Sequence, residues 1–426
     1  MKVWLAAAGL LLFLALPFIL AVADRPSQPA PPAEVTATIP DVLSAEQREA
    51  IFLDMWSQVD RNYLYWGRRT VDWSAVKEKY LPLARNAESV GAFRTVLKQA
   101  LAEVEDGHVA LIDPEGSVGR PHVWVEPDGD QLAIAWVDAG SDAAKAGLKA
   151  GMLLQTIDGL GAAEAWAREE AAASATMAPT RKWLGGRNVL RGPFGSSTMV
   201  VASFPGQAPV TATLVRDAQV DAYSSLFEKK VLPGGIVYIA LRSFGHPEVL
   251  QPAKTALLDV ARREPPGLIM DVRYNRGGNS ESVTDFSQVL FPKSTILGFR
   301  QDNRTGQKVA LTTTAATLAY EGPLVVLTNQ SCGSACDLFV LSLQQKERAV
   351  LVGETPCGAG IRGELHILPN GFQMSLSSPS EMLDRQGQPI EQNPAQVDYR
   401  VAPTAADWAA GRDPVLEKAV ELLQAP

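Results

Sequence analysis

Near the start of the chain, apolar residues recur at helical spacing, with Ile51, Met55 and Val59 four residues apart. This spacing places them on one face of an α-helix. The run Ser44-Ala45-Glu46-Gln47 just before them resembles a capping box, which is a common helix start. Two further helices are expected at residues 73–83 and 90–103. The pattern therefore predicts a helical amino-terminal domain over residues 41–116.

Between residues 117 and 217 the apolar runs become short and strand-like. Strands are expected at 123–125, 132–137, 199–202 and 210–215, around one short helix. The stretch from Ser141 to Gly151 is rich in small residues and glycines and leads into an apolar run that ends at Gly159. Glycines at such places permit tight turns. This helix, turn and strand resemble those of a PDZ domain, although Asp142 replaces the usual proline and Met152 the usual aspartate.

From about residue 218 to 426, strands and helices alternate. Strands of the buried type are expected at 236–241, 268–272, 324–327 and 349–352, with helices at 248–261 and after Ser334. Strands that alternate with helices favour a sheet covered by helices. The fold class expected for residues 218–426 is therefore α/β.

The first 40 residues differ from the rest. Residues 3–23 are uncharged and apolar, and Ala21-Val22-Ala23 fits the small-residue pattern of a signal-peptidase site. A run of this length, at about 1.5 Å per residue, is also long enough to span a bilayer. Residues 1–23 are thus either a cleaved signal peptide or a retained membrane anchor, and both would place the rest of the chain in a periplasmic or extracellular compartment. Residues 24–40 carry five prolines and are expected to form an extended tether.

Composition limits the classes of function. Hydrophobic residues make up 46% of the 426 and charged residues 20%, which fits folded domains and argues against disorder. The net charge of -8 argues against nucleic-acid binding, because phosphates are neutralised by basic surfaces. Three cysteines exclude a cysteine-rich zinc module, and four histidines without an H-E-x-x-H motif argue against a histidine-based metal site. No metal or organic cofactor is expected.

Two segments carry residues suited to chemistry, and the first is Asp-Val-Arg-Tyr-Asn-Arg-Gly-Gly at 271–278. It directly follows an apolar strand. The adjacent Gly277 and Gly278 let the backbone turn sharply and leave N–H groups free to face a ligand. The alternative is an ordinary turn at the end of a strand.

The second segment, 324–337, is an apolar strand followed by a turn of small residues, with Ser334 where a helix begins. A serine at such a junction is presented as in a nucleophile elbow, beside the free N–H groups of the helix start. Capping of the helix is the alternative role for Ser334.

Together these segments resemble the carboxyl-terminal processing and tricorn-core family of serine peptidases. The family pattern D-x-R-x-N-x-G-G matches 271–278, N-x-x-S-A-S-A-x-E matches 329–337, and V-G-e-x-T-x-G-K-G matches 352–360. The resemblance covers everything after residue 40. It implies a crotonase-like α/β peptidase core over 218–426, with an inserted PDZ-like domain at 117–217 and the helical amino-terminal domain.

One departure from the family pattern indicates the mechanism. The processing peptidases carry a catalytic lysine at the position of Ala359, whereas the tricorn-type branch uses a histidine after the helical region. His108 stands at that place, so the resemblance assigns it as the general base for Ser334. Glu391 falls at the place of a glutamate that completes the charge network, with an electrostatic or orienting role. The serine that precedes the histidine in the tricorn pattern is Gly107 here.

The resemblance also implies an oxyanion hole and a position for the third cysteine. The oxyanion hole would use the backbone N–H of Gly277 or Gly278 together with that of Ala335. Cys357 lies on a loop that in the family packs beside the nucleophile. In an oxidising compartment it either bridges to Cys332 or Cys336, or all three remain buried free thiols.

A substrate-binding site is expected in the PDZ-like domain. PDZ domains bind a chain-terminal carboxylate on the N–H groups of a glycine-containing loop that precedes a strand, and the peptide adds as a further strand. The corresponding loop here is 116–121, in which Pro121 lacks an N–H and Arg120 can attract the carboxylate. Arg120 and Val123 are therefore expected to bind substrate.

The sequence thus predicts an exported serine endopeptidase that hydrolyses extended polypeptides, with the PDZ-like domain aiding substrate capture or regulation. Polypeptides are the expected partners, nucleic acids are not, and a retained segment 3–23 would attach the protein to a membrane. Fold alone does not settle function, since the interphotoreceptor retinoid-binding protein resembles this family and is a carrier. The alternatives are therefore an inert binding protein or a PDZ scaffold on the same fold.

Overall fold

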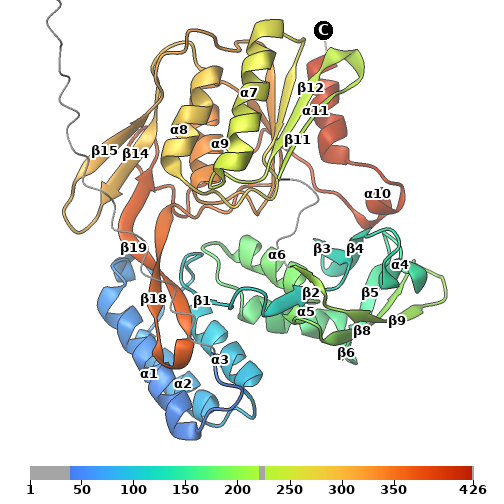
Figure 1. Ribbon diagram of the computed structural model, residues 1–426, viewed down its shortest axis with the longest axis vertical. Coiled ribbons are helices and arrows are strands. Elements are labelled where there is room, and N and C mark those ends of the chain that lie inside the picture. The colour runs from blue at the N-terminus through green and yellow to red at the C-terminus, as the bar shows by residue number, and fades with distance from the viewer. Residues whose placement is uncertain (1–38, 220–225, 425–426) are drawn as a thin grey trace, which may run out of the picture. The chain divides into compact units, whose positions relative to one another are not determined.

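The computed structural model describes residues 39–219 and 226–424 (Figure 1). The predicted leader at 1–23 and the tether up to residue 38 lie outside the described residues. Within the two described ranges, no helix combines the length and the apolar character needed to cross a membrane.

A six-stranded sheet forms the centre of the carboxyl-terminal half of the chain. Its order is β11-β12-β13-β16-β17-β20, and every neighbouring pair is parallel except β11 with β12. The strands are β11 (Phe227–Val231), β12 (Val237–Leu241), β13 (Leu268–Asp271), β16 (Leu324–Thr328), β17 (Val350–Gly353) and β20 (Tyr399–Arg400). The predicted alternation of strands and helices in this region is confirmed.

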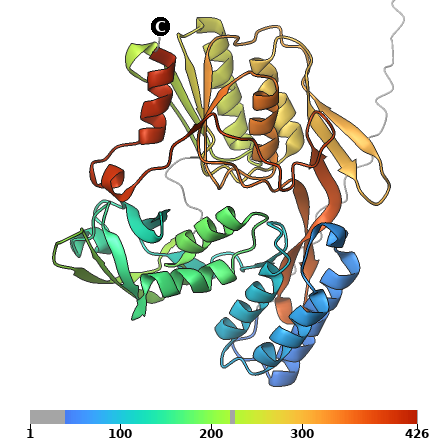
Figure 2. The same ribbon diagram turned by 180° about the vertical axis from the view of Figure 1, so that it is seen from behind.

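Both faces of this sheet are covered, which explains why β12, β13 and β16 are buried along their whole length. Alternate residues of these strands pack with α7 (Pro247–Arg263), α8 (Ser280–Ser287) and α9 (Ala335–Gln345). The residues between them pack against α11 (Pro414–Gln424), the red helix beside the strands in Figure 2.

A second sheet joins one strand that follows the helical region to four strands of the carboxyl-terminal half of the chain. Its strands are β1 (Ala110–Ile112), β14 (Ile296–Asp302), β15 (Lys308–Thr312), β18 (Ile361–Ile367) and β19 (Gln373–Leu383). Three helices pack on β18 and β19 (Figure 1): α1 (Ala45–Asn62), α2 (Trp73–Arg85) and α3 (Val90–Ala102). The capping box at Ser44 is confirmed. The hydrophobic core of the helical region is thus shared with strands more than 250 residues away in sequence, such as β19.

The middle region forms a further sheet with its own helices. The order is β3-β4-β5-β8-β9, with β6 paired to β5, and a small sheet β10-β2-β7 lies apart from it. The strands are β2 (Val118–Arg120), β3 (Val123–Asp128), β4 (Gln131–Val137), β5 (Leu153–Ile157), β6 (Leu160–Gly161), β7 (Gly192–Pro193), β8 (Ser197–Ser203), β9 (Val210–Val215) and β10 (Ala218–Gln219). The four predicted strands are present. One short helix was expected, but the structure has three: α4 (Asp142–Lys145), α5 (Ala162–Ala171) and α6 (Ala178–Asn188).

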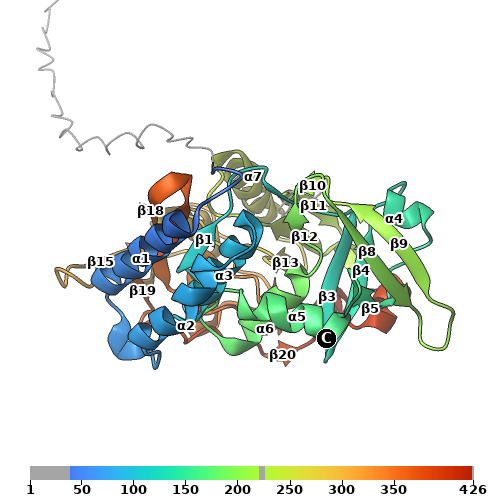
Figure 3. The same ribbon diagram turned by 90° about the horizontal axis from the view of Figure 1, so that it is seen from below.

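Helices α5 and α6 lie side by side in this region (Figure 3), and α6 packs along β3. The remaining short elements are the helix α10 (Ala405–Ala409) and 3₁₀ turns at Trp66–Arg68, Pro233–Gly235, Gln288–Leu290 and Pro369–Gly371.

The shared core predicts a large effect of Phe372→Ala on stability. Phe372 is fully buried and its ring meets that of Phe93 of α3 edge to face, with centroids 5.6 Å apart. Truncation should lower the free energy of unfolding in urea by about 3–5 kcal/mol, because it removes buried area and leaves a cavity. Leu365→Ala is the matched control, since Leu365 lies on the neighbouring strand β18 and is 55% exposed. Equal effects of the two substitutions would contradict a core shared by helices and strands.

Candidate active site

The turn between β16 and α9 holds Ser334 in an unusual backbone conformation. Its φ is 57° and its ψ is -122°, a region that costs a non-glycine residue on the order of 1–3 kcal/mol. Ser334 is partly exposed. Its side chain makes no capping hydrogen bond to any described residue of α9. The geometry is that of a serine presented at a strand-to-helix turn rather than of a helix cap.

A disulfide spans this turn. It joins Cys332 to Cys336, and Cys357 is the free cysteine of the described residues. The predicted alternatives, a bridge from Cys357 or three free thiols, are therefore both wrong. Cys357 does lie beside the turn, because a Cβ placed on Gly333 would come within 2.6 Å of its Sγ. The two cysteines on either side of Ser334 are close in sequence and form the bond instead.

The paired glycines lie directly against the serine turn. Their φ angles are 92° at Gly277 and 137° at Gly278, both in the range that favours glycine. A Cβ on Gly277 would come within 2.8 Å of the Ala335 nitrogen. The N–H of Gly277 donates to Oδ1 of Asn275 at 2.9 Å, so it is already engaged. Gly278 and Ala335 remain as the candidate donors of an oxyanion hole.

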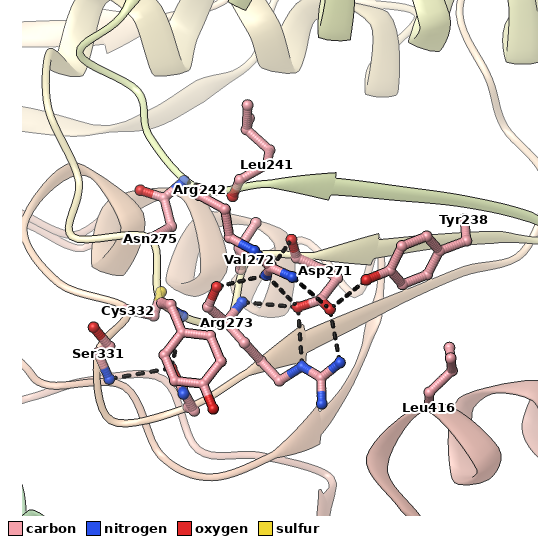
Figure 4. Close-up of polar contacts among 12 residues, drawn as sticks. Tyr238, Leu241, Arg242, Asp271, Val272, Arg273, Asn275, Ser331, Cys332 and Leu416 are labelled. Atoms are coloured by element: carbon pink, nitrogen blue, oxygen red, sulfur yellow. Dashed lines mark hydrogen bonds and ion pairs between the residues drawn. The ribbon is translucent and has the colours of Figure 1, made fainter. Parts of the chain in front are cut away.

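The start of the glycine segment is anchored by a buried carboxylate. Figure 4 shows the side chain of Asp271 between Tyr238, Arg242 and Arg273, which donate to it at 2.7, 2.9 and 2.7 Å. Burial alone would raise the pKa of Asp271, but the guanidinium groups of Arg273 and Arg242 hold it well below its usual range. Arg242 also donates to the carbonyl of Arg273 at 2.6 Å. This network fixes the end of β13, from which the glycines follow.

His108 lies in a turn that is fixed by another buried carboxylate. The backbone N–H of His108 donates to Oδ1 of Asp106 at 2.9 Å. The second oxygen of Asp106 accepts from Tyr63 and Arg69, at 2.9 and 3.1 Å. Burial lowers the pKa of His108, the charge of Asp106 opposes this, and Arg276 adds to it. The imidazole is therefore neutral at neutral pH, and its Nδ1 has no hydrogen-bond partner among the described residues.

Glu391 belongs to the same buried network as Asp106. Its Oε1 accepts from Arg69 at 2.8 Å and from the hydroxyl of Thr176 at 3.0 Å, while its Oε2 accepts from the N–H of Gly360 at 2.8 Å. Burial and the nearby Asp106 raise the pKa of Glu391 to about 7, although Arg69 opposes the shift. Its contacts thus reach the histidine turn through Arg69 and Thr176.

Two of these partners were not expected from the sequence. Arg69 follows the first predicted helix, and Thr176 comes from the middle region, between α5 and α6. Thr176 also accepts from the N–H of Gly107 at 3.1 Å. A hydroxyl therefore lies against the position where the tricorn pattern has a serine. No local sequence signal marks either residue, because both act through long-range contacts.

One loop, residues 357–360, contacts both helix α9, which begins just after Ser334, and the turn that holds His108. Asp337, buried in the first turn of α9, accepts from the N–H groups of Gly358 and Ala359, each at 3.0 Å. On the other side, the Cβ of Ala359 is 3.6 Å from where a Cβ on Gly107 would lie. Burial raises the pKa of Asp337 to about 7, against the lowering effect of the N–H donors. The loop thus contacts both the first turn of α9 and the turn that holds His108.

Arg120 and Val123, the predicted substrate-binding residues, lie apart from Ser334 and His108, near the carboxyl end of α6. The predicted glycine loop at 116–121 is wrong in part, because Val118–Arg120 form strand β2, paired with β7 and β10. The guanidinium of Arg120 stacks over the ring of Trp124, 4.9 Å from its centroid. Together with their neighbours they line a small pocket formed by Arg120, Val123, Trp124, Val125, Arg187, Leu190 and Arg191.

An aromatic cluster links this pocket to the glycine segment. The guanidinium of Arg187 lies 4.0 Å from the ring centroid of Trp124 and 5.0 Å from that of Tyr274. Its Nε also pairs with the buried carboxylate of Glu126 at 3.2 Å. Tyr274 has a φ of 63° and donates its N–H to Oδ1 of Asn329. A cavity of about 340 Å³, lined in part by Glu126, Tyr274 and Asn329, adjoins the cluster.

Comparison with known proteins supports a peptidase identity. Residues 235–401 match Peptidase family S41, and residues 44–102 match the Tricorn protease C1 domain. A carboxyl-terminal-processing protease of Synechocystis is 27% identical over 355 residues, which cover 79% of this chain and 77% of that protein. A putative tricorn protease homolog of Streptomyces coelicolor is 26% identical over 414 residues, covering 89% of this chain and 32% of the longer protein.

Among solved structures, mature CPAF has the same fold, with a TM-score of 0.69 over 88% of this chain and 98% of that one, at 14% identity. This likeness shows the fold, while the family matches show the enzyme class. The chain is a serine-type peptidase whose residues 235–401 match Peptidase family S41, and it is similar to the carboxyl-terminal-processing and tricorn proteases.

Proposed function

We propose that the protein is an exported endopeptidase that cuts extended polypeptides through an acyl-enzyme formed on Ser334, with His108 as the base. The observation that carries this proposal is the loop 357–360, which contacts the nucleophile helix through Asp337 and the histidine turn through Ala359. The core is proposed to be crotonase-like, with the middle region as an inserted PDZ-like domain.

The reaction follows from the roles of four groups. Ser334 Oγ attacks the peptide carbonyl while His108 accepts its proton and then delivers it to the leaving amine. The N–H groups of Gly278 and Ala335 stabilise the negative charge that develops on the carbonyl oxygen. Water, activated by the same imidazole, then hydrolyses the acyl-enzyme and restores the serine.

The buried carboxyl groups of Asp106 and Glu391 are proposed to hold His108 in place. Asp106 fixes the backbone of His108, and Arg69 joins Asp106 to Glu391. A neutral imidazole with a lowered pKa is ready to accept a proton at neutral pH. Because this base is available, Ala359 at the position of the family lysine is compatible with catalysis.

Substitution of the two residues tests the proposed mechanism. Ser334→Ala should abolish labelling by a fluorophosphonate probe, and His108→Ala should lower kcat and the labelling rate by about 10²- to 10⁴-fold, the usual contribution of a general base. His366→Ala is the matched control, since that histidine lies on β18 and contacts Gln58. Labelling of His108→Ala at the wild-type rate would exclude the histidine as base.

The pH dependence belongs to the same test. Because burial lowers the pKa of His108 from its usual 6.5, the acid limb of kcat/KM should lie below pH 6.5. Activity should rise as the pH increases through this limb, since the unprotonated imidazole is the base. An acid limb well above pH 6.5 would contradict the assignment.

We propose that the middle region captures the carboxyl-terminal end of a substrate. Strand β3 is at the edge of its sheet, so a peptide can add to it as a further strand. The pocket beside it is lined by Arg120, Arg187 and Arg191, and arginine side chains favour a carboxylate. Arg187 is already paired with Glu126, so Arg120 and Arg191 are the proposed partners of the carboxylate. Val123, the first residue of β3, is buried at the same place.

The capture proposal predicts a specific effect of Arg120→Gln. KM for a peptide with a free terminal carboxylate should rise by about tenfold, the value expected for loss of one hydrogen bond to a charged group, while kcat stays unchanged. The same peptide with an amidated end should be cleaved with an already high KM that the substitution does not alter. Arg168→Gln, on the exposed face of α5, is the control. Equal KM values of the wild type for the free and amidated peptides would contradict carboxylate capture.

Export is supported by the apolar segment 3–23 and by the disulfide, since disulfides persist in oxidising compartments. Amino-terminal sequencing of the protein from its host should find a chain that begins at Asp24, because the signal peptidase pattern ends at Ala23. A membrane-bound chain that begins at Met1 would favour the anchor instead. The full-length chain in the cytoplasmic fraction would contradict export.

A second candidate is an inert binding protein or scaffold on this fold, and Ala359 in place of the family lysine is the observation that favours it. In that case Ser334→Ala would bind peptides as the wild type does, and the wild type would neither cleave them nor react with the fluorophosphonate probe.

A further inference from the structure

The Cys332–Cys336 disulfide encloses the serine turn. Cys332 stands two residues before Ser334 and Cys336 two residues after it, and both cysteines are fully buried. The bond therefore closes a small covalent ring whose middle residue is the proposed nucleophile. No other covalent link within residues 39–219 and 226–424 spans this turn.

The turn needs such support because its conformation is unfavourable. Ser334 has a positive φ of 57°, and residues in such regions persist only where their surroundings fix them. Hydrogen bonds add to the support: the Gly333 N–H donates to the Asn275 carbonyl at 3.2 Å, and the Cys336 N–H donates to the Gly333 carbonyl at 3.0 Å. These bonds can open and close, whereas the ring limits how far the turn can relax.

We propose that the Cys332–Cys336 disulfide is a positioning element that holds Ser334 in the conformation from which it attacks. This inference rests on the proposed peptidase function and assigns a role to two residues outside the catalytic groups. A shift of the serine by about 1 Å is enough to lower a reaction rate by on the order of 100-fold, so a loosened turn should act mainly on kcat.

The ring also supports the loop that carries the third cysteine. The Cys357 N–H donates to the Cys332 carbonyl at 2.9 Å, so the loop 357–360 starts from the ring itself. Opening the ring should therefore loosen the contact between Asp337 and the N–H groups of Gly358 and Ala359.

Cys357 is close to the bond but is held in a form that does not exchange with it. Burial and the neighbouring Asp337 raise the pKa of the Cys357 thiol, and the thiolate is the form that attacks disulfides. Cys357 thus stays a thiol, and the 332–336 pairing is kept.

The test compares Cys332→Ala, Cys336→Ala and the double variant with the wild type. If the bond is what positions Ser334, each single variant should lose about as much kcat and labelling rate as the double variant, about tenfold or more, with KM little changed. Ser342→Ala, which shortens a buried small side chain further along α9, is the matched control. Thermal unfolding, measured for every variant, identifies any loss of the whole fold.

Reduction of the wild type by a dithiol gives a second route that needs no substitution. The dithiol is oxidised to its cyclic disulfide, the bond between the two Sγ atoms breaks, and two electrons and two protons yield thiols at Cys332 and Cys336. Thiol counting under denaturing conditions should rise from one to three, and activity should fall and return on reoxidation. Because both sulfurs are buried, the reaction is followed until the count is complete.

Three results would overturn the proposal: wild-type kcat in the double variant, additive losses in the two single variants, or three free thiols in the active enzyme. Failure of the proposed function is distinguishable from these, because the oxidised wild type would then not react with the fluorophosphonate probe. In that case the rate of amide hydrogen exchange in residues 329–343 still tests whether the disulfide holds the turn in place. Exchange should accelerate when the bond is opened, and unchanged exchange would contradict this role.

Discussion

The site depends on one buried carboxyl group, that of Asp337 in the first turn of α9. It accepts hydrogen bonds from the N–H groups of Gly358 and Ala359. These bonds attach the loop 357–360 to the helix that begins after Ser334. An acidic group is favoured near a helix start, where unpaired N–H groups give a positive potential. Together with the bonds from the Cys357 N–H to the Cys332 carbonyl and from the Gly360 N–H to Glu391, this attachment holds the loop between the serine turn and the histidine turn.

From that loop the network extends to His108, the proposed base. Gly360 donates to Glu391, Glu391 accepts from Arg69, and Arg69 also binds Asp106, which fixes the backbone of His108. The residues come from the helical region, the middle region and the core, so none of these regions forms the site alone. Buried charges are costly to leave unpaired, so loss of any one of these partners should destabilise the network.

Much of this organisation was predictable from the sequence, for identifiable reasons. The helices at 45–62, 73–85 and 90–102 and the buried strands β12, β13 and β16 follow from local periodicity, which needs no knowledge of distant residues. Ser334 and the paired glycines stand in segments whose order along the chain matches a family. Their places in the structure are consistent with those roles, and the roles themselves remain proposals.

What was missed depends on contacts between distant residues. The pairing of β18 with β19 and the packing of α1 to α3 on them leave no local signal, and the boundary at residue 116 divides a shared core. The Cys332–Cys336 bond was not expected, since the sequence led only to a bridge from Cys357 or to three free thiols. Thr176 and Arg69 could not be assigned, because their role comes only from the fold.

The most direct test of the account is a double-mutant cycle on the rate of peptide cleavage, using Ser334→Ala, His108→Ala and both together. If the loop 357–360 assembles serine and histidine into one catalytic unit, the double variant should be no slower than Ser334→Ala alone, because the histidine has no further role once the nucleophile is gone. Losses that add independently would show that His108 acts elsewhere, and would contradict the central claim.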